Sequence, residues 1–488
     1  MVRLLAVLAL SLACGASVPP PSRVASPPPA PPPSAPIVRY PRGVLALVHV
    51  RLYDGTLAAA REDQTIIVDG ARLVAIGPSA TTQVPAGATV VDLSGRSVLP
   101  GLIGMHDHLF YTDVAFPRGP GDRVMPLMPE LAHSAPRLYL AAGVTTLRTT
   151  GSVEPYADLH LRQLIEQGAP GPELDVTAPY MEGPGADFPQ MSELADPEHA
   201  RRFVAYWADA GATSFKAYMH LSRAVLAAAV DEAHRRHLKV TGHLCAVTYA
   251  EAAEAGIDNL EHGFFAATDL DPTKRPDVCP DAADDAPSVL AGDPGAPAVR
   301  ALIRTLVEHQ VALTSTLAVY EDLVPGHALE PRVLALLSPA VAAQYRVRRS
   351  KIDARPEAGA HLHVRREQQL ERAFVQAGGL LLAGADPTGV GGVLPGYGDQ
   401  RELELLVDGG FSAIEAIHIA TYNGARYLGR LDRVGTVEPG KQADLVIVRG
   451  DPGARIRDVE NVELVIKRGV GYDPDALVDS VRGEVGLR

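Results

Sequence analysis

Short apolar runs alternate with amphipathic stretches along most of the chain. Short apolar runs bounded by turn-forming residues are typical of buried strands, and the stretches between them have the period of helices. Ser222–Arg236 begins with a favoured N-cap residue, and Val364–Ala377 also has helical composition. Strands in a repeated βα order predict an α/β protein built on a (β/α)8 TIM barrel. The predicted strands are Val98–His108, Val144–Arg148, Leu174–Tyr180, Ser214–Met219, Lys239–Leu244, Asn259–Gly263, Ala312–Leu317 and Leu380–Asp386.

Two segments outside this alternation have the pattern of strands joined by turns. They are Val44–Val98, in which Asp69-Gly70 is a hairpin signal, and Gly435–Gly469. Neither segment is large enough to bury a core alone. We therefore expect both ends of the chain, residues 38–97 and 434–488, to form one small β-sandwich beside a barrel of residues 98–433.

The start of the chain has a different character. Arg3 precedes the apolar run Leu4–Ala13, which predicts a secretory signal peptide in residues 1–14. Cys14 follows a small residue, as in bacterial lipoprotein cleavage sites. The proline-rich residues 15–37 predict a disordered linker. We expect an exported periplasmic or cell-surface lipoprotein that meets the membrane only through a lipid on Cys14. Ordinary secretion and an uncleaved start are the alternatives.

Charge and cysteine content narrow the possible partners. The formal net charge is −13, which argues against nucleic acid as a partner. Beyond the start, no stretch approaches the apolar length of a membrane-spanning helix. The chain has 3 cysteines, and the sequence leaves open whether Cys245 and Cys279 are paired. We expect a small-molecule substrate, and the sequence leaves a homo-oligomer open.

The candidate chemistry begins with two histidines at the end of the first predicted strand. His106 and His108 are two residues apart, so on a strand they point to the same face and can bind one metal ion. Imidazole suits zinc and similar divalent cations. An isolated H-x-H pattern is weak, so further ligands at later strand ends decide the matter. The later predicted strands carry Lys216, His243, His262 and Asp386 at or near their C-terminal ends.

Each of these residues also has a simpler interpretation. A strand-end histidine is more often a hydrogen-bonded core residue, Lys216 alone fits a surface lysine, and Asp386 before Pro387 fits a turn. However, each residue interrupts an apolar strand, where burial without a partner is costly. Their occurrence in order at successive strand ends favours a metal site.

Two other histidine pairs are excluded as ligands. His361 and His363 have the same spacing, but the residues after them have helical composition. On a helix, positions i and i+2 point well apart. His234 and His237 lie at a charged helix end, where we expect them to face solvent.

The residue set resembles the binuclear branch of the amidohydrolase superfamily that has a carboxylated lysine. The resemblance extends from Val44 to Gly471. The resemblance implies two divalent ions, most simply zinc, and N6-carboxylysine at Lys216. An ammonium there would repel both metals, whereas a carbamate supplies a bridging anion. By resemblance the metal ligands are His106, His108, Lys216, His243, His262 and Asp386. The motifs that carry it are Pro-Gly-Leu-Ile (100–103), Gly-Val-Thr-Thr (143–146), Glu-His-Gly (261–263), Ala-Gly-Ala-Asp (383–386) and Gly-Lys-Gln-Ala-Asp-Leu-Val (440–446).

The resemblance implies hydrolysis of an amide or peptide bond by a hydroxide that bridges the two metals. Dipeptides or N-acyl amino acids are the expected substrates, because similar ligand sets occur in dipeptidase-like and imidazolonepropionase-like members. Asp386 is expected to act as general base and then acid. Tyr218 and His220 alternate onto the same side of the strand as Lys216, where they can polarise the carbonyl or hold substrate. Deamination is disfavoured, because Ala246 stands where deaminases of the family typically have glutamate.

Two alternatives remain. The same metal pair serves organophosphate or lactone hydrolysis, and a catalytically inactive cell-surface binding module is a different class. An intact ligand set argues against the module, which needs none of it.

The sequence departs from the family pattern in three places. Gly104 replaces the aspartate common two residues before the first histidine, and the Arg-Asp pair after the second strand is Arg148-Thr149. The loop Met181–Met191 lacks the Gly-His pattern of dipeptidase-like members. The first two changes affect support of the ligands, and the third leaves the substrate undetermined.

Overall fold

The eight predicted barrel strands are present, in the predicted order. In this computed structural model the described residues are 36–111, 128–186, 188–280, 288–355, 359–389 and 392–486. Neighbouring strands pair in parallel in two groups, β7-β8-β9 and β12-β13-β14-β15-β16. The strands are β7 (Leu102–Gly104), β8 (Val144–Arg148), β9 (Glu173–Asp175), β12 (Ser214–Ala217), β13 (Lys239–Gly242), β14 (Asn259–Glu261), β15 (Ala312–Ser315) and β16 (Leu381–Ala383).

Hydrogen bonds connect the two groups of strands at both edges. The amide of Met105, just after β7, donates to the carbonyl of Ala383 in β16 over 2.9 Å. On the other side, Thr177 forms a parallel bridge with Ser214 at the start of β12. The C-terminal ends of all eight strands therefore point toward the same face.

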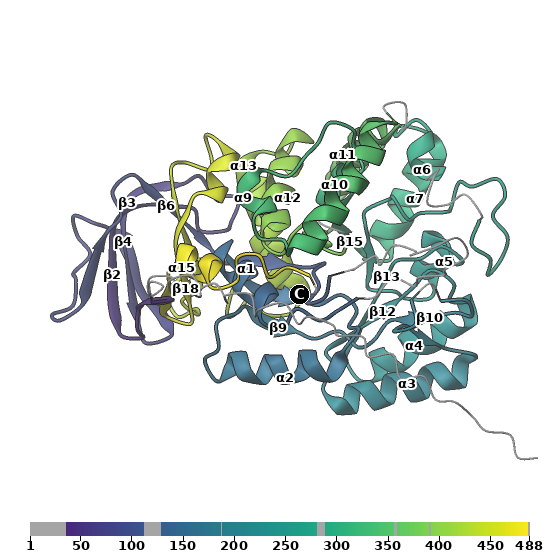
Figure 1. The fold of residues 1–488 in the computed structure, drawn as a ribbon, viewed down its shortest axis with the longest axis horizontal. Helices are drawn as coiled ribbons and strands as arrows, with labels where there is room; N and C mark the ends of the chain where they lie inside the picture. Colours follow the sequence, from purple (N-terminus) through teal and green to yellow (C-terminus); the bar gives the residue numbers. More distant parts are fainter. Residues whose placement is uncertain are drawn as a thin grey trace, which may run out of the picture. The chain divides into compact units, whose positions relative to one another are not determined.

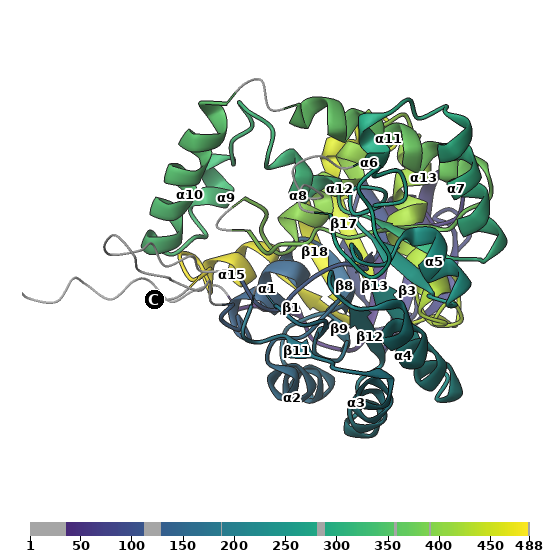
Figure 2. The same cartoon turned by 90° about the vertical axis from the view of Figure 1, so that its right-hand side faces the viewer.

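Helices follow most of these strands and lie outside them. Figure 2 shows α2, α3, α4, α5, α7 and α11 around the strands labelled β8, β9, β12 and β13. The predicted cap is confirmed, because the Ser222 side chain accepts a hydrogen bond from the amide of Val225 at the start of α4. The helices are α1 (Ser134–Ala141), α2 (Pro155–Glu166), α3 (Pro197–Ala210), α4 (Arg223–Arg235), α5 (Tyr249–Glu254), α6 (Ser288–Ala291), α7 (Pro297–Glu308), α8 (Leu317–Glu321), α9 (Pro331–Leu334), α10 (Pro339–Asp353), α11 (Ala360–Gln376), α12 (Tyr397–Asp408), α13 (Ala413–His418), η1 (Ile419–Asn423), α14 (Gly424–Tyr427), η2 (Ile456–Glu460) and α15 (Pro474–Asp479).

Strands from both ends of the chain combine as predicted, but they form one branched sheet rather than two separate sheets. Its hydrogen-bonded order is β1-β19-β18-β17-β6-β2-β3-β4, with β5 beside β2. Figure 1 shows the N-terminal strands β2, β3 and β4 beside the C-terminal strand β18. The strands are β1 (Val38–Tyr40), β2 (Val44–Leu52), β3 (Arg61–Asp69), β4 (Arg72–Pro78), β5 (Thr89–Asp92), β6 (Arg96–Pro100), β17 (Leu445–Arg449), β18 (Val462–Lys467) and β19 (Val470–Tyr472).

The sheet has its own apolar core, to which both chain ends contribute. Leu45, Leu47 and Ile66 pack there with Leu445 and Ile447. The predicted hairpin at Asp69-Gly70 is confirmed as the turn between β3 and β4. Each chain end supplies only part of this core, which explains why neither end was expected to fold alone.

Most of the barrel strands end earlier than predicted, and three differences change how a segment is assigned. Residues Val98–Pro100 were assigned to the first barrel strand, but they belong to β6 and pair with β17. The third barrel strand is shorter than Leu174–Tyr180, and only isolated bridges at Thr177 and Pro179 continue it. The loop expected at Met181–Met191 begins with a two-residue strand, β10 (Met181–Glu182), which pairs with β11 (Ser192–Glu193) and β12.

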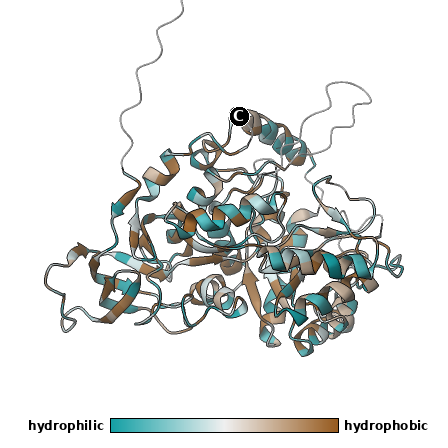
Figure 3. Ribbon diagram, turned by 90° about the horizontal axis from the view of Figure 1, so that it is seen from below, coloured by the Kyte–Doolittle hydropathy of each residue, from teal (hydrophilic) through white to brown (hydrophobic). Residues whose placement is uncertain are grey.

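The distribution of apolar residues agrees with this architecture. In Figure 3 hydrophobic residues colour the inner strands, while the outer helices carry both hydrophobic and hydrophilic residues. Among the described residues, no helix has both the length and the hydrophobicity to cross a membrane. The predicted signal peptide (1–14), Cys14 and all but the last two residues of the predicted linker (15–37) lie outside the described residues.

Candidate metal centre

The six predicted ligands lie at or just after the C-terminal ends of barrel strands. His106 and His108 follow β7, and Lys216 is the penultimate residue of β12. His243, His262 and Asp386 follow β13, β14 and β16. Because the strands are parallel, these side chains reach the same end of the barrel.

Three of the ligands form a tight group of donor atoms. One donor atom each from His106, His108 and Asp386 lie within 4.8 Å of one another. The Asp386 carboxylate oxygen Oδ1 lies 3.0 Å from Nε2 of His108 and 3.5 Å from Nε2 of His106. Both histidines are 1 % exposed. Two imidazoles and a carboxylate are a donor set that suits zinc, so the residues fit a divalent ion.

The other three predicted ligands border this group. The His262 ring lies 4.5 Å from the His106 ring and 4.5 Å from the His243 ring, measured between centroids. Lys216 is 1 % exposed, although lysine is rarely buried without a partner. The structure therefore brings all six predicted ligands into one region.

Burial and charge hold His106, His243 and His262 in the neutral form that a metal ligand needs. Burial, together with the positive charge of Lys216, lowers the pKa of His106 to about 4 and that of His243 to about 3. Burial and the neighbouring histidines also lower the pKa of His262 well below its usual range. Neutral imidazole retains a lone pair for a cation.

The charged members of the group are shifted as well. Burial raises the pKa of Asp386, but His106, His108 and His262 outweigh it and hold the pKa well below its usual range. Burial lowers the pKa of Lys216 to about 8, against the opposing effects of Glu261 and Asp386. Lys216 is therefore closer to its neutral amine form than an ordinary lysine.

A buried ion pair beneath the ligands was not predicted. The Glu261 carboxylate lies 2.8 Å from Nδ1 of His106 and accepts a hydrogen bond from Arg148 over 2.8 Å. Arg148 also donates to the carbonyl of Met105. A histidine ligand whose other ring nitrogen donates to a carboxylate is fixed in tautomer and orientation. Glu261 ends the buried strand β14 directly before His262, so its place at a strand end could also have identified it.

The backbone at two ligands adopts an unusual conformation. His262 has φ 66° and Asp386 has φ 49°, in the left-handed region that non-glycine residues rarely adopt. Nδ1 of His262 also lies 2.8 Å from Oγ1 of Thr316. Residues held in sparsely populated conformations cluster at functional sites, which supports a role for both residues.

Two glycines at the centre are closely packed against neighbouring residues. A side chain at Gly104 would lie 1.7 Å from a carboxylate oxygen of Asp107, so Asp107 occupies the space that an aspartate at 104 would need. Asp107 faces Asp399, and burial with this second acid raises the pKa of Asp107 well above its usual range. At Gly384 a side chain would lie 2.3 Å from the backbone nitrogen of His106.

The two predicted auxiliary residues lie beside the ligands. The Tyr218 ring lies 5.0 Å from the His243 ring and 5.3 Å from the Tyr180 ring. His220 is held by Glu182, whose carboxylate accepts from the His220 amide over 2.7 Å and lies 3.3 Å from Nδ1. Both side chains are half-buried at the end of β12.

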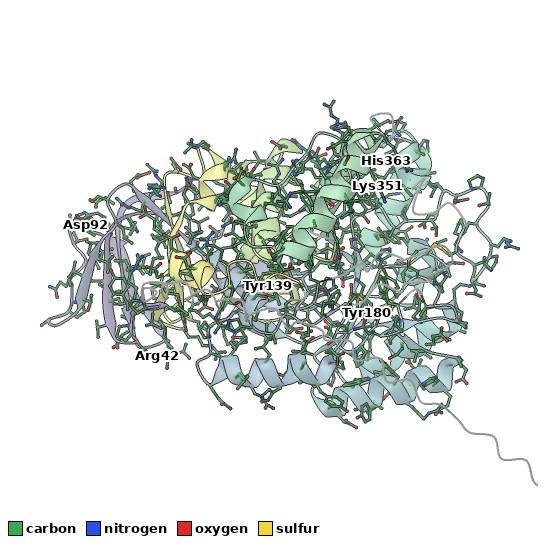
Figure 4. All side chains as sticks on the ribbon, viewed as in Figure 1. Arg42, Asp92, Tyr139, Tyr180, Lys351 and His363 are labelled. Carbon is green, nitrogen blue, oxygen red and sulfur yellow. A yellow bond between two sulfur atoms is a disulfide. The ribbon has the colours of Figure 1, made fainter. Side chains whose placement is uncertain are left out.

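The rejected histidine pairs lie away from this centre. His361 and His363 are on α11, as predicted. Figure 4 labels His363 on the outer helices, apart from Tyr139 and Tyr180 in the barrel. The Tyr139 hydroxyl, on α1, forms hydrogen bonds with the backbone of His108, so Tyr139 lies beside the predicted ligands. His234 pairs with Asp258 at the end of α4, and its side chain is 44 % exposed.

The pairing of the two cysteines, which the sequence left open, is seen in the structure. Cys245 and Cys279 form a disulfide. It joins the segment after β13 to a segment that follows β14. Cys245 lies two residues after His243, so the crosslink adjoins the candidate metal centre.

A family model and solved structures match this chain. The Amidohydrolase family model matches residues 372–471. The imidazolonepropionase of Arthrobacter sp. (strain FB24) is 31% identical over 103 residues, which is 21% of this chain and 22% of the relative. The chain thus matches about a fifth of the length of this curated relative.

Solved structures resemble a much larger part of the chain. A proposed prolidase from Bifidobacterium longum has a TM-score of 0.59 and 28% identity, and the match covers 91% of this chain and 100% of that one. A Xaa-Pro dipeptidase with bound methionine has a TM-score of 0.63 and 20% identity, covering 88% of this chain and 100% of that one.

The fold and the donor set define a TIM-barrel protein with a candidate divalent-metal centre at the C-terminal ends of its strands. The family model and the structural neighbours, taken with this geometry, support the amidohydrolase superfamily.

Proposed function

We propose that this protein is a metal-dependent hydrolase that cleaves the amide bond of dipeptides or N-acyl amino acids. The observation that carries the proposal is the buried donor group of His106, His108 and Asp386, with Lys216, His243 and His262 around it. Three neutral or anionic donors within 4.8 Å are costly to bury unless a cation compensates them. Among the solved neighbours, a Xaa-Pro dipeptidase is consistent with a peptide-like substrate.

The proposed cofactors are two divalent ions, zinc in the first place, and a carbamate on Lys216. When bound, such ions acidify water and polarise a carbonyl group. Lys216 must be neutral to add to carbon dioxide, and burial lowers its pKa to about 8, which favours that form. The resulting carbamate would be negatively charged and would attract cations, whereas an ammonium at this position would repel them.

The residues of the chain then have separate tasks. The Asp386 carboxylate accepts a proton from the attacking water and returns it to the leaving nitrogen. Glu261 and Arg148 hold His106 in one orientation. Tyr218 and His220 lie at the end of β12, from which a phenol or imidazole can donate to the carbonyl oxygen as charge develops.

We further propose export of the protein and its attachment to the membrane through Cys14. The apolar run Leu4–Ala13 and the proline-rich residues 15–37 support this proposal.

Metal content and turnover test the proposal together. Purified protein should contain about two zinc-like ions per chain. In Asp386→Asn, kcat should fall by at least ~100-fold, the usual scale for a lost general base, with little change in Tm. His361→Gln on α11 is the matched control and should leave kcat unchanged. Metal-free protein with full activity, or near-normal turnover of Asp386→Asn, would overturn the proposal.

A further inference from the structure

A cavity of about 310 Å³ adjoins the candidate metal centre at His243. Its size is at the lower end of the range for small-molecule sites. Tyr218 lines it on the side of β12, and Phe265 and Tyr320 line it on the side of β14 and β15. We call this space the aromatic chamber, with Tyr218, Phe265 and Tyr320 as its walls and Met219, Leu244 and Leu323 as its other apolar lining.

Two of the aromatic walls lie against the rings of predicted histidine ligands. Phe265 and Tyr320 are stacked, with their centroids 3.4 Å apart and their planes 4° from parallel. The Tyr320 ring meets the His262 ring edge-on at 5.8 Å. Tyr218 stands 5.0 Å from His243 on the other side. A group in the chamber is therefore held at a fixed position relative to the ligands.

The lining is poor in charge. Among its described residues, Asp271 is the single one with a full charge, and neither lysine nor arginine occurs. Oδ1 of Asp271 already accepts hydrogen bonds from the amide and hydroxyl of Thr273. An acidic side chain placed here would meet no lysine or arginine of the lining and would lie near the like charge of Asp271.

The chamber is also covalently braced. Cys245 lines it and is joined to Cys279, and the carbonyl of Cys245 accepts a hydrogen bond from the Thr268 hydroxyl. A site formed before binding loses less ordering free energy when the ligand enters. The chamber therefore has the properties of a preformed apolar specificity site.

We infer that the substrate carries an uncharged aromatic or bulky aliphatic group on one side of its scissile amide, and that this group occupies the aromatic chamber. The inference rests on the proposed function and narrows its substrate class. It selects dipeptides and N-acyl amino acids with a phenylalanine-like or leucine-like group next to the scissile bond, and it disfavours an acidic group there.

A matched pair of variants tests the inference by turnover. Dipeptides with Phe, Leu, Ala or Asp at each position are assayed with parent protein, Phe265→Ala and Phe203→Ala. Phe203 is a half-buried phenylalanine on α3, outside the chamber. Phe265→Ala should lower kcat/KM by about 10-fold or more for the Phe substrates and little for the Ala substrates. Phe203→Ala should change kcat/KM by a similar factor for every substrate. A preference for Asp, or an equal loss on every substrate in Phe265→Ala, overturns the inference.

Binding measured by calorimetry separates this inference from the proposed function. Phenylacetamide should bind the parent protein, bind Phe265→Ala at least about 10-fold more weakly, and compete better than succinamate. If no dipeptide is cleaved but this binding pattern holds, the proposed function fails, and only the selectivity of the chamber for an aromatic group is supported. If dipeptides are cleaved but phenylacetamide does not bind, or binds both proteins equally, the inference fails and the function stands.

Discussion

Replacing Glu367 by glutamine should change how the stability of this protein depends on pH. Glu367 lies on α11, is 1 % exposed, and accepts a hydrogen bond from the amide of Phe264 over 2.8 Å. Burial raises its pKa to about 8. Glu371, one turn further along α11, is 0 % exposed, and burial beside Glu367 raises its pKa well above its usual range.

The direction of the effect follows from proton binding. An unfolded chain releases the Glu367 proton near pH 4.5, whereas the folded protein keeps it until about pH 8. Below pH 4.5 Glu367 is protonated in both states, so its ionisation does not change the free energy of unfolding there. As the pH rises from there to about 8, the folded state holds more protons than the unfolded state, so the free energy of unfolding falls. The loss is on the order of 4 kcal/mol by pH 8, because each unit of pKa shift is worth about 1.4 kcal/mol.

Glutamine keeps the acceptor oxygen for the Phe264 amide but does not ionise. Glu367→Gln should therefore gain stability relative to the parent as the pH increases, with a difference of a few kcal/mol at pH 8 and a small one near pH 5. Thermal unfolding from pH 5 to 8.5, at one metal loading, measures this difference in Tm. Glu308→Gln, at an exposed position on α7, is the matched control and should follow the parent. Parallel curves for the parent and Glu367→Gln would refute the buried neutral carboxyl.

Three further predictions concern the centre, the crosslink and the start of the chain. Lys216→Ala should lose bound metal and activity together, and short carboxylic acids with bicarbonate should restore part of both by supplying bridging oxygens; full metal content in this variant contradicts the carbamate. The double variant Cys245→Ser with Cys279→Ser should lose about 3–4 kcal/mol of stability, because the disulfide spans 34 residues; a Tm equal to that of the parent excludes this contribution. Cys14→Ser should release the protein from the membrane fraction while kcat is unchanged, and equal membrane retention rules out the lipid anchor.

Periodicity alone was sufficient to predict the alternation of strands and helices. Val144–Arg148 was predicted to the residue, and Ser222 was identified as a helix cap. Local rules decide these features, because a strand or a helix imposes its period of burial on its own residues. The order of the candidate ligands along the chain could be predicted for the same reason. Parallel strands bring their C-terminal ends to one face, so residues such as His243 and Asp386 were expected to converge.

Strand boundaries were less predictable. Val98–Pro100 reads as a continuation of the first barrel strand, yet these residues pair with β17 near the other end of the chain. The same is true of the terminal strands, which were expected in a sandwich and form one sheet. Where a strand stops depends on the partner that accepts its hydrogen bonds, and that partner is not encoded in the local pattern.

Only the tertiary structure decided how the centre is supported and enclosed. Glu261 reaches His106 across 155 residues of sequence and Arg148 across 113. The Cys245–Cys279 disulfide and the stacking of Phe265 on Tyr320 likewise depend on how the loops after neighbouring strands meet. The sequence by itself predicted the strand order and the set of candidate ligands. The pKa values, the packing and the chamber depend on distances between side chains on different loops. These distances are set only when the barrel has formed.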